Sequence, residues 1–104
     1  MNASHANLWI EGRWTAAESG AVAESIDPST GEVLGRFDDA GVADAKRAIE
    51  AARCAFETTE WAQAPRLRAQ VLLAFAERVE QRAETLALLL ARETGKLLKA
   101  AQAE

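Results

Sequence analysis

The stretch DPSTGEVLGRF, residues 27–37, combines turn chemistry with a short extended segment. Its aspartate can accept local hydrogen bonds, the proline after it fixes φ at the second position of a turn, and Gly31 permits a left-handed backbone. The stretch therefore predicts a hairpin with the arms Ala23–Asp27 and Glu32–Phe37. Turns of the form Asp-Pro-x-x-Gly are common, so this pattern by itself predicts a local structure and no function.

A first hairpin is predicted upstream of this one. Leu8–Ile10 and Arg13–Thr15 flank a glutamate and Gly12, and a two-residue connection with glycine at its second position is typical of a tight turn. In that register Trp9 lies opposite Trp14, so both indoles share one face of the ribbon. A two-stranded ribbon is marginal in water, and we expect its apolar face to dock on another surface.

The remainder of the chain has the pattern of amphipathic helices. Apolar residues recur at spacings of three and four, which predicts a helix over Val42–Glu57. Gly41 is an acceptable N-cap for it, and Asp44 in the first turn suits the positive end of the helix dipole. The next helix begins at Pro65, because the first position of a helix needs no N–H.

A single helix from that proline to Thr94 would be unusually long, so we expect a break near Gln81–Glu84 and a third helix after it. Gly95 is a suitable C-cap in the left-handed conformation. Leu97–Glu104 has the pattern of a fourth helix that begins near the end of the sequence. We interpret that ending as the sign of a truncated protein.

Composition limits the possible functions. The 104 residues allow at most one small domain, and a hydrophobic fraction of 49% with 27% charged residues is ordinary for a globular protein. The net charge is −4, without the basic stripe that nucleic-acid binding needs. No apolar run is long enough to cross a bilayer, and no secretory signal is seen. The one cysteine fits a reducing cytoplasm.

Few residues in this sequence could carry chemistry. Cys54 is the one candidate nucleophile, but helical spacing places it near Arg47 and Glu50, which supply no base. The single histidine, His5, lies in an N-terminus that we expect to be frayed. One cysteine and one histidine, distant in sequence, cannot assemble a metal site. We therefore predict that Cys54 is not catalytic.

Two phosphate-binding patterns also fail. A phosphate-binding loop that ended in Gly95-Lys96 would need a glycine at Leu90 and a hydroxyl residue at Leu97. The glycines of the 27–37 stretch do not form the G-x-G-x-x-G sequence that opens a dinucleotide-binding helix. We predict no cofactor-binding residue in these 104 positions.

Arg68 lies at helical spacing with the apolar face of the second predicted helix. Its guanidinium could reach water from the first turn, or it could anchor a carboxylate or carbonyl on an element outside this chain, and both readings stay open. Glu93 ends the apolar stripe of the third helix. A solvated carboxylate is the expected reading there, with a partnered one as the alternative.

In order, these elements resemble the N-terminal segment of the NAD(P)-dependent aldehyde dehydrogenase superfamily, from Asn7 to Glu104. The resemblance is carried by LWIEGRW, by DPSTGEVLGRF, by AIEAARCAF with Trp61, and by PRLRAQVLLAFAERVEQRAETLALLLARETGK. The ordered series, ending in the tetrad Glu93–Lys96, is more specific than any single part.

The resemblance implies a parent enzyme that oxidises aldehydes to carboxylic acids. In that family a cysteine thiolate attacks the aldehyde, hydride passes to nicotinamide, and a glutamate-activated water releases the thioester. Those residues and the cofactor loop lie beyond this segment, which in the family packs against the cofactor-binding domain as scaffold. The resemblance therefore implies that Cys54 and Glu93 are not the family's nucleophile and base, and that catalytic, cofactor and metal residues are absent here.

The expected fold is an α/β parent of the aldehyde dehydrogenase type. Within it, residues 1–104 are a partial N-terminal portion, with β-hairpins over 7–38 and three to four helices over 41–104. The parent would use NAD or NADP and an aldehyde substrate, form a homo-oligomer and work in the cytoplasm, without nucleic acid or membrane. This segment alone would bind no cofactor and be inactive. The alternative is a free-standing, non-enzymatic interaction module derived from the same superfamily.

Overall fold

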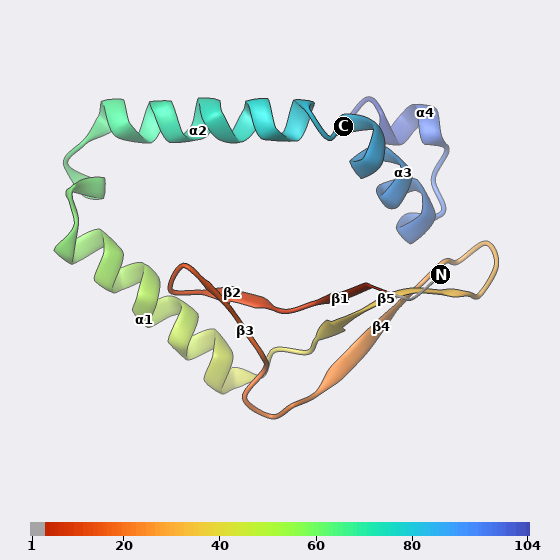
Figure 1. Cartoon of the computed structure of the whole chain (residues 1–104), viewed down its shortest axis with the longest axis horizontal. Helices are drawn as coiled ribbons and strands as arrows, with labels where there is room; N and C mark the ends of the chain where they lie inside the picture. The colour runs from red at the N-terminus through yellow and green to blue at the C-terminus, as the bar shows by residue number, and fades with distance from the viewer. Residues whose placement is uncertain (1–3) are drawn as a thin grey trace. The chain divides into compact units, whose positions relative to one another are not determined.

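The structure, a computed structural model, describes residues 4–104 and places a β-rich part before a helical part along the chain (Figure 1). The strands are β1 (Ser4–Ala6), β2 (Leu8–Ile10), β3 (Arg13–Thr15), β4 (Val22–Ile26) and β5 (Val33–Asp38). The helices are α1 (Val42–Thr58), a 3₁₀ turn η1 (Glu60–Ala62), α2 (Pro65–Glu80), α3 (Ala83–Thr94) and α4 (Leu98–Ala101). This order of hairpins and helices confirms the predicted architecture.

The first hairpin has the predicted register. β2 pairs antiparallel with β3, and Trp9 lies opposite Trp14. Their ring centroids are 4.8 Å apart with an interplanar angle of 69°, an edge-to-face arrangement that aromatic pairs prefer. Both turn residues have positive φ, 56° at Glu11 and 72° at Gly12, as the tightest hairpin turn requires. Glu11 is the residue that bears the strain of that turn, because a side chain disfavours a left-handed backbone.

The second hairpin joins β4 to β5 around the 27–37 stretch. The Asp27 N–H donates to the Glu32 carbonyl at 2.9 Å, and the Gly31 N–H donates to the Asp27 carbonyl at 2.8 Å. The Asp27 carboxylate accepts the N–H of Ser29 at 2.8 Å, the local bond expected of a turn aspartate. Gly31 has φ 76°, which explains why glycine stands there.

β1 is a strand that the sequence did not predict. Residues around His5 were predicted to be frayed, but Ser4–Ala6 pairs in parallel with β5, and Ser4 lies opposite Gly35. β5 thus has a neighbour on each side, and the sheet order is β1-β5-β4. The pairing joins segments about thirty positions apart, so no local sequence pattern could predict it.

The helix ends follow the predicted capping. Gly41 is the N-cap of α1, and the side chain of Asp44 accepts the Gly41 N–H at 2.9 Å. α2 begins with Pro65 at its first position, and Gly95, whose φ is 72°, is the C-cap of α3. The break between α2 and α3 also lies where it was predicted. α4 is shorter than the expected helix over Leu97–Glu104.

Two compact units can be distinguished, and they do not follow the division between strands and helices. One unit holds the residues up to Ser25 together with Val33–Gln63, so α1 belongs with the strands. The other holds Ile26–Glu32 and Ala64–Glu104, so the turn of the second hairpin belongs with α2, α3 and α4. The turn of the second hairpin therefore shares one compact unit with α2, α3 and α4, and α1 lies in the other unit.

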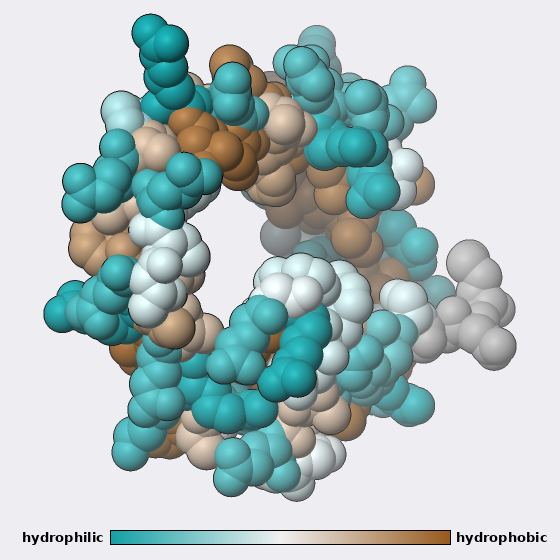
Figure 2. All heavy atoms as spheres, turned by 60° about the vertical axis from the view of Figure 1, so that its left-hand side comes forward, coloured by the Kyte–Doolittle hydropathy of each residue, from teal (hydrophilic) through white to brown (hydrophobic). Residues whose placement is uncertain are grey.

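Very little apolar surface is buried within the chain. Among residues 4–104 the buried apolar side chains are one isoleucine and three alanines: Ile10, Ala17, Ala87 and Ala101. On α2, Leu72 and Phe75 remain 63% and 66% exposed, and Figure 2 shows apolar surface in its upper part, where α2 lies. None of the helices described is both long and apolar enough to span a membrane.

Candidate functional site

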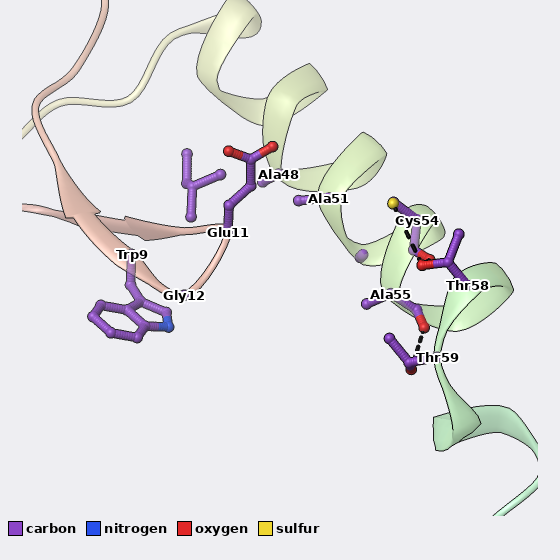
Figure 3. A pocket seen from close by; sticks show the side chains of 11 residues that line it. Trp9, Glu11, Gly12, Ala48, Ala51, Cys54, Ala55, Thr58 and Thr59 are labelled. Carbon is purple, nitrogen blue, oxygen red and sulfur yellow. Dashed lines mark hydrogen bonds between the residues drawn. The ribbon is translucent and has the colours of Figure 1, made fainter.

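A hollow beside Cys54 lies between the first hairpin and α1 (Figure 3). It measures about 600 Å³. Trp9, Glu11 and Gly12 line it from the hairpin, and alanine side chains of α1 point toward it. Cys54 lies at its edge. The walls are apolar and small, so the hollow offers volume and few directing polar groups.

Cys54 is exposed and has hydroxyl neighbours. Its Sγ lies 3.7 Å from Oγ1 of Thr58, and that hydroxyl donates to the Cys54 carbonyl at 2.7 Å. A threonine hydroxyl is too weak a base to deprotonate a thiol, and nucleophilic cysteines depend on a base or a cationic neighbour. The surroundings agree with the prediction that Cys54 is not catalytic, which stays a prediction.

The described residues do not assemble a metal centre. Residues 4–104 contain no group of three or more histidine, cysteine or acidic side chains placed to hold an ion. His5 instead lies 3.2 Å from Asp38, measured from Nε2 to Oδ1. The sequence gives no sign of this role for Asp38, because its partners His5 and Asn7 are more than thirty positions away.

Asp44 is the most buried polar side chain described, with 2% of its surface exposed. Besides the Gly41 N–H, it accepts the N–H of Glu18 at 3.1 Å and a bond from Arg47 Nη2 at 2.6 Å. The Gly41 bond first, and then the Arg47 guanidinium, hold the pKa of Asp44 below its ordinary value. The carboxylate therefore remains ionised at neutral pH and ties the loop after β3 to the start of α1.

The turn of the 27–37 stretch and the Glu93–Lys96 tetrad meet in the second unit. Arg92 Nε lies 3.7 Å from Oδ2 of Asp27, and a methyl group added at Gly95 would lie 3.1 Å from Cγ of Pro28. The DPSTG turn thus packs against the ETGK end of α3. This contact defines how the turn and the helix fit together.

Arg68 is half-buried on the first turn of α2, and Glu93 is exposed near the end of α3. The two readings of Arg68 differ in what an uncharged side chain of similar length would do. If Arg68 anchors an element outside this chain, Arg68→Met in the intact parent protein should lower stability by about 1.5–3 kcal/mol, the contribution of hydrogen bonds to a charged group. The urea midpoint of the parent protein measures it, and an unchanged midpoint would exclude the anchor.

Taken together, the strands, the helices and the contact between turn and helix define a mixed α/β segment. Residues 14–104 match the aldehyde dehydrogenase family, and the chain belongs to that family.

Relatives with established names show how much of the family protein is covered. The chain is 39% identical over 98 residues to a 3,6-anhydro-alpha-L-galactose dehydrogenase of a Vibrio species, covering 93% of this chain and 20% of that protein. It is 44% identical over 98 residues to an N-succinylglutamate 5-semialdehyde dehydrogenase of a Caulobacter species, again with 93% and 20% coverage.

Solved structures agree with the sequence relatives. A betaine aldehyde dehydrogenase double mutant from Staphylococcus aureus, in complex with NAD+, superposes with a TM-score of 0.90 at 32% identity. The match covers 99% of this chain and 21% of that one. The chain thus spans about a fifth of the length of the proteins it matches.

Proposed function

We propose that these 104 residues are the N-terminal portion of an aldehyde dehydrogenase and serve in it as scaffold. The observation that carries this proposal is the coverage: nearly the whole chain superposes on about a fifth of a dehydrogenase, with a TM-score of 0.90. The exposed apolar faces of α1 and α2 support it, because an amphipathic helix is stabilised mainly by burying such a face.

The parent protein would oxidise an aldehyde to a carboxylic acid and transfer hydride to NAD or NADP. The named relatives act on aldehydes or are called dehydrogenases, and the Staphylococcus aureus protein is in complex with NAD+. The residues described here would contribute shape and packing to that enzyme. The nucleophile, the general base and the cofactor-binding groups would come from chain outside these 104 residues, so Cys54 would take no part in the reaction.

The parent is proposed to be a homo-oligomer of the cytoplasm that needs neither nucleic acid nor membrane. The exposed thiol of Cys54 supports a reducing compartment, where such a group stays reduced. The formal charge of −4 supports the absence of a nucleic-acid partner, since phosphate backbones attract basic surfaces.

The alternative, a free-standing interaction module, rests on the exposed indoles of the first hairpin and the leucines of α3 as a surface for a partner chain. The coding DNA beyond Glu104 discriminates between the two. An open frame continuing into a cofactor loop and a later cysteine motif supports the scaffold, and a stop codon supports the module.

A chimera tests the scaffold function directly. The matching fifth of the Caulobacter dehydrogenase would be replaced by this chain, and reduction of the nicotinamide cofactor with its semialdehyde substrate would be followed by absorbance. We expect the chimera to recover activity that a deletion of the same segment lacks. The chain on its own, with NAD or NADP and a panel of aldehydes, should give no reduction above background.

A matched variant of the chimera tests the site prediction. Cys54→Ser should leave the activity of the chimera unchanged, because the thiol is not expected to meet substrate. Activity in the isolated chain, or its loss in the Cys54→Ser chimera, would contradict the assignment of chemistry to the rest of the parent protein. A chimera as inactive as the deletion would remove the scaffold proposal itself.

A further inference from the structure

Besides its backbone pairing with β5, the first strand is held to the sheet by one buried carboxylate. The side chain of Asp38 is 5% exposed, and its two oxygens have different partners. Oδ2 accepts the amide of Asn7 at 2.8 Å, and Oδ1 lies 3.2 Å from Nε2 of His5. One side chain at the end of β5 therefore holds the chain on both sides of Ala6.

Apolar burial contributes little to this attachment. All three residues of β1 are exposed, and the strand pairs along one edge only. The fit to β5 is nevertheless close, since a methyl group added at Gly35 would lie 3.0 Å from both the carbonyl oxygen and Oγ of Ser4. A short, exposed strand without apolar anchors belongs to the part of a fold that opens most easily.

This strand also links two sheets. Residues 4–10 form two strands separated by Asn7 alone, of which β1 pairs with β5 and β2 pairs with β3 (Figure 1). The point where the chain passes from one sheet to the other is the residue whose amide Asp38 binds.

We propose that residues 4–7 are a releasable strap, which Asp38 fastens to β5 and which holds the hairpin of Trp9 and Trp14 to the three-stranded sheet. When the strap opens, the edge of β5 loses its neighbour while the hairpin keeps its own pairing. Asp38 is a positioning residue in this device, independent of whether the parent enzyme is a dehydrogenase.

Disulfide trapping in the chimera, with the cysteines of the dehydrogenase part replaced, tests the strap. In a Cys54→Ser background, Ala6→Cys and Phe37→Cys place thiols at partner positions of β1 and β5, and the rate of disulfide formation in a glutathione buffer reports how often the strap is closed. Asp38→Ala should slow trapping by about tenfold or more, because hydrogen bonds from both partners to a charged group are lost. Gly35→Ala should also slow it. The matched control Asp39→Ala removes a neighbouring carboxylate and should leave the rate unchanged.

A second thiol pair separates strap opening from general unfolding. Leu8→Cys and Thr15→Cys lie at partner positions of the first hairpin, and Asp38→Ala should leave their trapping rate unchanged. Equal slowing of both pairs would show a general structural role and overturn the strap. The proposal also fails if Asp38→Ala leaves the rate of disulfide formation between β1 and β5 unchanged. It fails as well if the protein that keeps Asp38 forms this disulfide no faster in buffer than in denaturant.

Discussion

The isolated 104-residue chain is expected to unfold gradually on heating, with the indoles of Trp9 and Trp14 open to a neutral quencher at every temperature. In the structure these side chains are 58% and 68% exposed. A sharp thermal transition needs a core whose side chains are released together. The described residues supply one buried isoleucine and three alanines for that purpose.

The energetics point the same way. Burying one large aliphatic side chain contributes about 1.5–3 kcal/mol, whereas ordering each residue of the backbone costs about 1–2 kcal/mol. Most of the large apolar side chains that could offset this cost lie at the surface of α1, α2 and α3. We therefore expect the helices to form only partly until another surface covers these faces.

Acrylamide quenching and circular dichroism measure the expectation. Trp61→Phe leaves Trp9 and Trp14 as the emitting pair, and their quenching constant should approach that of a free indole in the isolated chain. The same variant within the chimera is the control, because covered indoles there should be quenched less. A compact monomer that melts sharply and shields both indoles would show that the chain is complete as a folded unit, contrary to our interpretation.

Local chemistry predicted most of what the structure contains. The turn at Gly31, the N-cap at Gly41, the proline that opens α2 and the C-cap at Gly95 each depend on neighbours within about four positions. Such features can be read from a sequence because the backbone conformation and its capping partner lie side by side in the chain.

The contacts that the sequence could not supply join distant positions. β1 pairs with a strand about thirty residues away, and Asp38 receives its partners from that strand and from Asn7. Asp44 was expected only as a favourable charge in the first turn of α1. Its burial comes from the bond to Glu18, which depends on how the loop after β3 folds back. An aspartate in a sequence gives no sign of which of these roles it has.

The prediction that no catalytic group is assembled in this segment came from the composition, with one cysteine and one histidine in 104 residues, and it stays a prediction. That inference needed no structure, since neither residue had a partner at a useful spacing. The hollow beside Cys54 could not have been foreseen, because it forms between the first hairpin and α1, which are far apart in sequence.

Gly95→Ala is expected to be the most damaging single substitution in the second unit. Gly95 has φ 72°, a conformation that costs a residue with a side chain about 1–2 kcal/mol. The new methyl group would also lie 3.1 Å from Cγ of Pro28, a ring carbon with little freedom to move. Overpacking of that kind adds about 1–3 kcal/mol, so both effects should lower the free energy of unfolding.

Gly31→Ala separates the two effects. Gly31 has φ 76°, but a methyl group there would have no neighbour within 4 Å, so that substitution carries the backbone term alone. In urea unfolding of the chimera, Gly95→Ala should lower the midpoint further than Gly31→Ala. Adding Pro28→Ala should restore part of that difference, because it removes the ring against which the methyl group packs. Equal midpoints for the two glycine variants would mean that the DPSTG turn and the end of α3 do not hold each other in place, and the motif contact would have no energetic role.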